Sequence, residues 1–286
     1  MAGYYVYIPD FLGGTKEPPC GTNSHANRIF LGDALDSSIL PKLAPTKQQV
    51  EGKTQGELDA NLGEAFSTMG PWLAKHAVET TYPHIQKFLS HLRADPAHKK
   101  IGAVGFCWGG KFTVLLTHQD ANPSVDAAVA FHPSLLNLPE DIEKIARPTS
   151  IGIGDADFVL PMSDIEKIQE IFKGKEGCEV DVYPDQVHGF AVRGDLALES
   201  DKKAAAKATE RVISHLCSST EFRHFRLSRS SRSICPSYES LLDVAECLRK
   251  IMFIVSIKYY PKFMQKILCT PLHSNALKTF ILYFTS

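Results

Sequence analysis

Several features that assign many chains to a class at once are absent from this sequence. Its seven cysteines are an odd number, lie far apart, and form neither a C-x-x-C pair nor a Cys/His spacing suited to zinc. The first residues do not combine a basic segment with an apolar one, and no apolar run approaches the roughly 18 residues needed to span a bilayer. We therefore expect reduced thiols, no bound metal, no membrane partner and a cytoplasmic location.

The chain also has almost no net charge, but its charges are unevenly distributed. The formal charge is −1 over 286 residues. Residues 218–286 carry 10 Lys and Arg against 4 Asp and Glu, which leaves 21 and 28 for residues 1–217. This asymmetry predicts a globular domain over residues 1–217 and a basic, partly helical tail over residues 218–286. We expect no nucleic-acid partner for either part.

One stretch, residues 100–111, has the layout of a nucleophile elbow. An apolar, strand-like run leads into Gly105-x-Cys107-x-Gly109, which is the G-x-S-x-G pattern with cysteine in place of serine. Glycine is needed at these flanking positions because the turn is so tight that side chains there would collide. The partial positive charge at the start of the following helix favours a thiolate. The structural alternative is a strand-to-helix turn with a buried, unreactive cysteine.

The same stretch partly matches a phosphate-binding loop of the form G-x-x-x-x-G-K-[ST]. Gly105, Gly110 and Lys111 occupy the first fixed positions of that motif. Phe112, however, stands where a serine or threonine hydroxyl would bind magnesium, and bulky Trp108 lies in the segment that should surround phosphates. The sequence therefore does not favour nucleotide binding.

Strand-like and helix-like segments alternate along the first 217 residues, which predicts a parallel sheet with helices on both faces. Pro71 suits the first turn of a helix, and Pro83 is expected to kink or split the segment that contains it. The predicted strands are 3–8, 100–106, 125–131, 149–154 and 179–183. The predicted helices are 34–40, 48–51, 57–69, 71–92, 112–118, 139–146, 161–172 and 201–217.

Three candidate catalytic residues each follow a predicted strand. Cys107, Asp157 and His188 stand in the order nucleophile, acid, histidine that is typical of α/β hydrolases. Because the carboxyl ends of parallel strands meet at one edge, we expect the three side chains to converge. His188 would accept the thiol proton, and Asp157 would fix the imidazole tautomer. Asp155 is a competing acid, and His132, at another strand end, is expected to line the pocket.

Four segments of the sequence resemble motifs of the dienelactone hydrolase (carboxymethylenebutenolidase) family. They are Gly-Phe-Cys-Trp-Gly-Gly at 105–110, Phe-His-Pro-Ser at 131–134, Gly-Asp-Ala-Asp at 154–157 and His-Gly-Phe at 188–190. The resemblance covers residues 3–217. It implies an α/β-hydrolase-type parallel sheet, and hydrolysis of a small ester or lactone through an acyl-thioester without a cofactor.

The resemblance also implies roles for particular residues. Cys107, Asp157 and His188 would form the triad, and the N–H of Trp108 would bind the oxyanion. Arg193 matches a family arginine that contacts a substrate carboxylate. A second substrate arginine has no counterpart in residues 65–75.

Both ends of the chain depart from the family pattern. The chain is expected to lack the first sheet strands, a second oxyanion donor and a glutamate that interacts with the resting cysteine, all of which lie upstream in the family. At the other end, the tail begins with an Arg/Ser-rich linker at 221–233 and continues with an apolar helical stripe over 241–255. The alternative to an enzyme is a non-catalytic fragment that binds a small molecule or a protein partner through the same pocket.

Overall fold

The described part of the chain is built around one parallel sheet. The computed structural model describes residues 4–7, 39, 42, 45, 52–96, 98, 100–195, 197–220 and 279–284. Its 6-stranded sheet has the order β1-β6-β2-β3-β4-β5, and every neighbouring pair is parallel. The strands are β1 (Tyr4–Tyr7), β2 (Lys100–Phe106), β3 (Ala127–Phe131), β4 (Thr149–Gly154), β5 (Cys178–Tyr183) and β6 (Thr279–Phe284).

The central strands are buried on both faces, as expected for a parallel sheet. Every residue of β3 and β4 is buried, and so is every residue of β2 after Lys100. Such strands consist of continuous apolar and small residues, because neither face meets water. The residues of β5, at the edge of the sheet, are mostly only half-buried.

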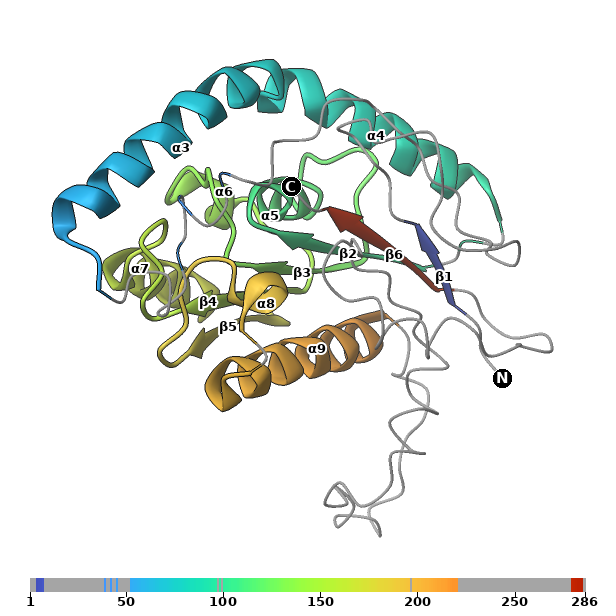
Figure 1. Ribbon diagram of the computed structural model, residues 1–286. Helices are drawn as coiled ribbons and strands as arrows, with labels where there is room; N and C mark the ends of the chain where they lie inside the picture. Colours follow the sequence, from blue (N-terminus) through green and yellow to red (C-terminus); the bar gives the residue numbers. More distant parts are fainter. Residues whose placement is uncertain are drawn as a thin grey trace, which may run out of the picture.

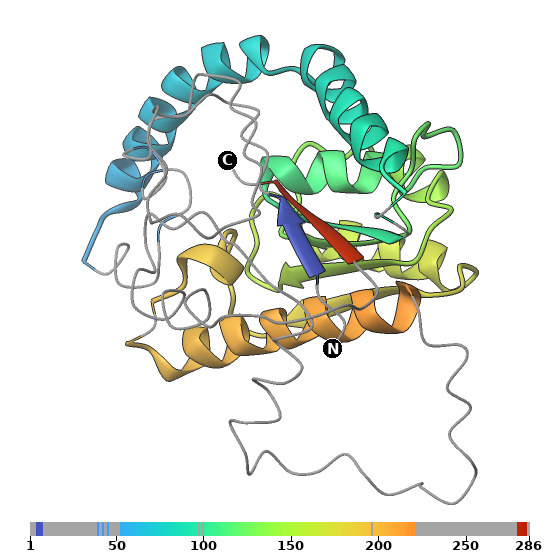
Figure 2. The same ribbon diagram turned by 90° about the vertical axis from the view of Figure 1, so that its right-hand side faces the viewer.

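Helices cover both faces of the sheet, which confirms the predicted fold class. In Figures 1 and 2, α4 and α5 lie on one face and α9 on the other. A Cβ atom added to Gly102 of β2 would lie 3.1 Å from Leu216 of α9, so that helix packs closely on the sheet. The helices are α3 (Gln55–Lys75), α4 (Val78–Ala94), α5 (Trp108–Leu115), α6 (Glu140–Glu143), α7 (Met162–Phe172), α8 (Phe190–Arg193) and α9 (Glu199–Thr220).

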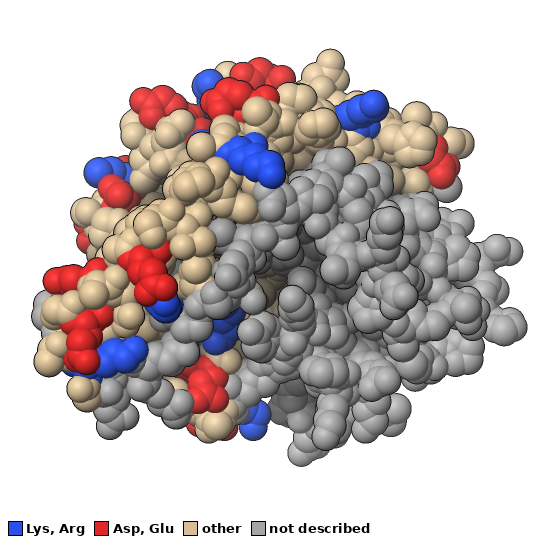
Figure 3. Space-filling model, turned by 45° about the horizontal axis from the view of Figure 1, so that its top comes forward, with Lys and Arg blue, Asp and Glu red and all other residues tan. Residues whose placement is uncertain are grey.

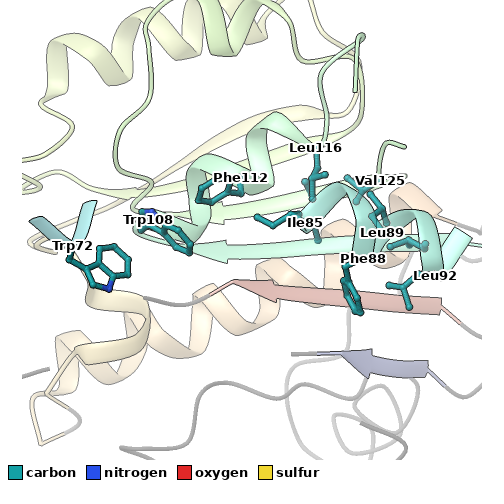
Figure 4. Packing of buried hydrophobic residues seen from close by; sticks show 12 residues of the cluster. Trp72, Ile85, Phe88, Leu89, Leu92, Trp108, Phe112, Leu116 and Val125 are labelled. Carbon is teal, nitrogen blue, oxygen red and sulfur yellow. The ribbon is translucent and has the colours of Figure 1, made fainter. Parts of the chain in front are cut away.

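The main hydrophobic core lies between α4, α5 and β2. Ile85 and Leu89 of α4 are fully buried, as are Ile101 of β2 and Phe112 of α5. Figure 4 shows the side chains of α4 pointing toward α5 and β2. Trp72 joins the same cluster, so the core reaches from the sheet to α3. This packing fixes α5, the helix that begins directly after Cys107.

The prediction for Pro71 is wrong, and the helix that contains Pro83 is not split there. Pro71 lies inside α3 rather than at the start of a helix, and α4 continues through Pro83. The break between the two helices falls instead at Ala77, whose ψ of 158° is extended. Continuation of α3 past Pro71 brings Trp72 into the core. In both helices, burial of an apolar face outweighs the local cost of proline.

Part of the predicted tail belongs to the sheet. Thr279–Phe284 form β6, which pairs in parallel with β1 on one side and β2 on the other. The linker over 221–233 and the helical stripe over 241–255 lie outside the described residues, as do nearly all of the helices predicted at 34–40 and 48–51. The division at residue 217 stays a prediction.

The surface of the described residues is mixed in charge. Figure 3 shows acidic and basic side chains interspersed over the described part of one face. None of the described helices combines the length and the apolar character that a bilayer crossing requires.

Candidate active site

Cys107 lies in a strained turn between β2 and α5. Its backbone has φ 51° and ψ −118°, in a region that residues other than glycine rarely adopt. The Cys107 N–H donates to the carbonyl of Phe131 at 3.1 Å. Its carbonyl accepts from the N–H groups of Gly110 at 2.9 Å and Ser134 at 3.1 Å. The surrounding backbone therefore holds the strained residue in place and leaves its thiol half-buried.

Glycine is required beside Cys107 because the chain folds back on itself. A Cβ atom at Gly105 would lie 2.2 Å from Thr113 Oγ1 and 2.4 Å from the carbonyl oxygen of Gly109. A Cβ atom at Gly110 would lie 2.8 Å from the Cβ of Pro133. The collision at Gly105 is the one that the elbow pattern predicts. The absence of a side chain at Gly110 lets the loop after β3 pack on α5.

Substitution of Gly105 with alanine is expected to destabilise the protein by about 1 to 3 kcal/mol, because the new methyl group meets backbone atoms that cannot move aside. Gly63→Ala is the matched control. An added Cβ there meets nothing within 4 Å on the exposed side of α3, so we expect a gain of about 0.5 to 1 kcal/mol. Urea unfolding measures both, and equal effects would contradict the steric explanation.

His188 and Asp157 form a buried pair. His188 Nδ1 lies 2.9 and 3.1 Å from the two carboxylate oxygens of Asp157. The two residues are only 3% and 4% exposed. Asp157 Oδ1 also accepts from the N–H of Val159 at 2.8 Å and of Leu160 at 3.3 Å, which orients the carboxylate. Asp155 is exposed, so the structure brings Asp157 to the histidine.

The imidazole of His188 also interacts with Cys107. Its Nδ1 is engaged with Asp157, and the Cys107 side chain contributes to the pKa of His188 through hydrogen bonding and charge. Burial lowers the pKa of His188, but the bonds to Asp157 and Cys107 outweigh that effect and raise the pKa to about 9. The Asp157 carboxylate is thus hydrogen-bonded to the His188 imidazole, and that imidazole interacts electrostatically with the Cys107 thiol.

The thiol is activated by its surroundings. Burial raises the pKa of Cys107, but hydrogen bonds from His188, Ser134 and the N–H of Trp108 outweigh it and lower the pKa to about 7. Because the pKa of His188 is about 9, thiolate and imidazolium coexist between these two values. The Cys107 thiol is therefore about half ionised near neutral pH and mostly ionised above it.

His132 packs against His188. Its side chain is fully buried, and its ring centroid lies 5.1 Å from that of His188 and 5.6 Å from that of Phe190. Burial, followed by the charges of His188 and Arg193, lowers the pKa of His132 well below its usual value. Among the described residues its ring nitrogens have no hydrogen-bond partner. A neutral His132 thus supports His188 from within, and its predicted pocket-lining role stays a prediction.

Arg193 lies at the end of α8, close to the same histidine. Its Nη2 donates to the His188 carbonyl at 3.2 Å. Gly189 makes this approach possible, since it has φ 93° and a Cβ there would lie 2.2 Å from Arg193 Nη2. Burial lowers the pKa of Arg193, while interaction with Cys107 acts in the opposite direction. The Arg193 guanidinium therefore interacts electrostatically with Cys107. Arg193 is the residue for which the resemblance implies a substrate contact.

Two further residues lie at the site, Ser134 and Phe158, for which the sequence predicts no role. Ser134 Oγ lies 3.8 Å from Cys107 Sγ. Phe158 is 49% exposed, and its ring centroid lies 5.9 Å from that of His188. Ser134 belongs to the Phe-His-Pro-Ser segment, and Phe158 directly follows Asp157. Adjacency to an assigned residue is thus the only sequence signal for either.

Lys111 is not placed to bind phosphate. Its side chain is buried and lies 2.5 Å from Asp141 Oδ2 in an ion pair between α5 and α6. The partial match to a phosphate-binding loop therefore has a structural explanation. Within the described residues, no three His, Cys, Asp or Glu side chains gather as ligands for a metal ion would.

A parallel sheet with a nucleophile elbow after one strand, and an acid and a histidine after later strands, defines an α/β hydrolase. A family model described as "Dienelactone hydrolase family" matches residues 1–219. The chain belongs to this family.

Individual relatives match shorter stretches. A carboxymethylenebutenolidase homolog of Xenopus tropicalis is 30% identical over 139 residues, which is 48% of this chain and 55% of the relative. Hydrolase tropI of Talaromyces stipitatus is 28% identical over 204 residues, covering 68% of this chain and 62% of that protein. The apo form of Thermogutta terrifontis esterase 2 is 21% identical with a TM-score of 0.32, covering 41% and 55% of the two chains. The chain thus spans about half to three fifths of the curated relatives it matches.

Proposed function

We propose that this chain hydrolyses a small carboxylic ester or lactone, with Cys107 as the nucleophile, His188 as the general acid and base, and Asp157 as the residue that orients His188. The observation that carries the proposal is the buried, hydrogen-bonded pair of Asp157 and His188, whose imidazole interacts with Cys107 in the elbow. Membership of the dienelactone hydrolase family supports the same chemistry.

In the acylation step, the Cys107 thiolate attacks the carbonyl carbon of the substrate. A carbon–sulfur bond forms, and the carbonyl electrons move to oxygen, which lies at the start of α5 near the N–H of Trp108. The oxyanion then collapses and breaks the bond to the leaving oxygen. The imidazolium of His188 gives its proton to that oxygen, so an alcohol and a thioester result.

In the deacylation step, His188 is neutral and takes a proton from water. The resulting hydroxide attacks the thioester carbonyl, and the second oxyanion expels the thiolate of Cys107. The carboxylic acid leaves, and His188 is again an imidazolium. The Asp157 carboxylate stabilises that cation in both steps, and no metal or organic cofactor takes part.

Arg193 favours a substrate that carries a carboxylate in addition to its ester or lactone group. Its guanidinium is half-buried beside the His188 backbone, and its charge acts on Cys107. A guanidinium there would hold a substrate carboxylate by charge-assisted hydrogen bonds.

The scattered cysteines support a cytoplasmic setting, in which thiols stay reduced.

The pH dependence of kcat/KM tests this assignment. We expect a bell-shaped profile with a rising limb near pH 7 and a falling limb near pH 9. Below the first value the thiol is protonated, and above the second His188 has no proton for the leaving group. Hydrolysis of p-nitrophenyl acetate measures the profile, with Cys107→Ala protein as the background.

A protein that shows no turnover above this background at any pH contradicts the proposal. If iodoacetamide still alkylates Cys107 in this inactive protein, the non-catalytic alternative explains the geometry of the thiol site better than an enzyme does.

A further inference from the structure

The loop after β3 contacts the nucleophile from two directions. The N–H of Ser134 donates to the Cys107 carbonyl at 3.1 Å, and the Ser134 hydroxyl lies 3.8 Å from Cys107 Sγ. Pro133 packs on Gly110, at a position where no side chain would fit. The loop is therefore seated against the elbow, with one hydroxyl facing sulfur.

We propose that Ser134 is a further residue of the catalytic site, whose hydroxyl donates a hydrogen bond to the Cys107 thiolate and stabilises its negative charge. The inference rests on the proposed function, in which this thiolate attacks the ester. A thiolate can accept several hydrogen bonds, and the N–H of Trp108 and His188 already provide two. The Ser134 hydroxyl adds a neutral donor, which stays in place when His188 gives up its proton.

A buried ion pair positions this loop. Asp141 Oδ2 accepts from Lys111 Nζ at 2.5 Å and from the N–H of Asn137 at 2.6 Å. Lys111 belongs to α5, which starts at the elbow, and Asn137 belongs to the loop that carries Ser134. The Asp141 carboxylate therefore ties the two segments together. Lys111 and Asp141 are positioning residues, since they act on the thiol only through Ser134.

The test is the rate of Cys107 alkylation by iodoacetamide as a function of pH. Ser134→Ala should raise the pKa of the thiol by about one, because a hydrogen bond of about 1 to 1.5 kcal/mol to the charged form is lost. Alkylation at pH 7 should then be about fivefold slower, with little difference from the parent at pH 9. Labelling of Cys107→Ala protein supplies the background from the other thiols.

Two variants serve as controls for Ser134→Ala. Ser134→Thr keeps the hydroxyl and should retain the parent profile. Ser90→Ala removes an exposed hydroxyl that bonds only within α4, to the carbonyl of Gln86 at 2.8 Å, and should change nothing. An unchanged profile in Ser134→Ala, or a loss of rate that is equal at every pH, would overturn the proposal.

The test also separates this inference from the proposed function. A shifted alkylation profile in a protein without esterase activity supports the role of Ser134 and rejects hydrolysis. Full esterase activity of the parent, together with an unshifted alkylation profile in Ser134→Ala, supports hydrolysis and rejects the role of Ser134.

The positioning part has its own experiment. Asp141→Asn should shift the alkylation profile in the same direction as Ser134→Ala, but add no further shift when Ser134 is already alanine. Additive shifts would overturn the positioning role. Where Asp141→Asn does not fold, Lys111→Met combined with Asp141→Leu removes the buried pair without leaving an isolated charge, and the same comparison applies.

Discussion

Cys107→Ala is expected to lower kcat for p-nitrophenyl acetate by at least about 10³-fold, because no covalent intermediate can form without the thiol. The remaining site could bind the substrate and hold the oxyanion, but the second step of the proposed reaction would have no thioester to hydrolyse. The variant should fold normally, since the thiol is half-buried and the turn is held by hydrogen bonds of the Cys107 backbone, which alanine keeps.

Cys178→Ala is the matched control for this substitution. Cys178 is also half-buried, but burial raises the pKa of its thiol, and its sulfur lies 3.6 Å from the carbonyl of Arg147. We expect this variant to retain the parent turnover. If Cys107→Ala hydrolyses the ester as fast as the parent, the nucleophile lies elsewhere and the proposed mechanism is wrong.

Asp157→Asn is expected to lower kcat by about 10³- to 10⁴-fold. An asparagine amide can present its NH₂ group to Nδ1, which favours the wrong imidazole tautomer, and it carries no charge to stabilise the imidazolium. The effect should be large because Asp157 and His188 are both buried, where electrostatic interactions are little screened.

Asp155→Asn provides the control, because Asp155 is exposed and lies in the same short segment. Its turnover should stay within about twofold of the parent, in line with the small effects of surface substitutions. The Asp157 variant should also move the upper limb of the pH profile to lower pH, since the bond to Asp157 raises the pKa of His188. Equal losses in the two variants would show that this acid does not act through the histidine.

The strands could be predicted closely because each is a short apolar run that ends in a turn signal. Thr149–Gly154 has the predicted bounds, and β5 begins one residue earlier than predicted. The continuation of α3 past Pro71 and of α4 past Pro83 could not be predicted, because these helices are held by contacts with residues distant in sequence. The insertion of β6 between β1 and β2 is likewise a long-range pairing with no local signature.

The same distinction applies to the site. Cys107, Asp157 and His188 could be brought together from the sequence because the carboxyl ends of parallel strands share one edge of the sheet. Burial, which the sequence does not give, distinguishes Asp157 from Asp155. The pairing of Lys111 with Asp141 depends on how a loop packs on a helix, so the sequence could argue against a phosphate-binding role for Lys111 but could not indicate its partner.

The contact between α3 and the elbow has a spectroscopic consequence. The chain contains two tryptophans, Trp72 and Trp108, and their ring centroids lie 5.4 Å apart in an edge-to-face arrangement. Both indoles are buried, and Trp108 is bonded directly to Cys107. All indole emission of the protein therefore originates beside the nucleophile, and α3 cannot leave the elbow without changing it. The native chain thus carries its own fluorescent reporter of covalent modification at Cys107 and of helix movement beside it.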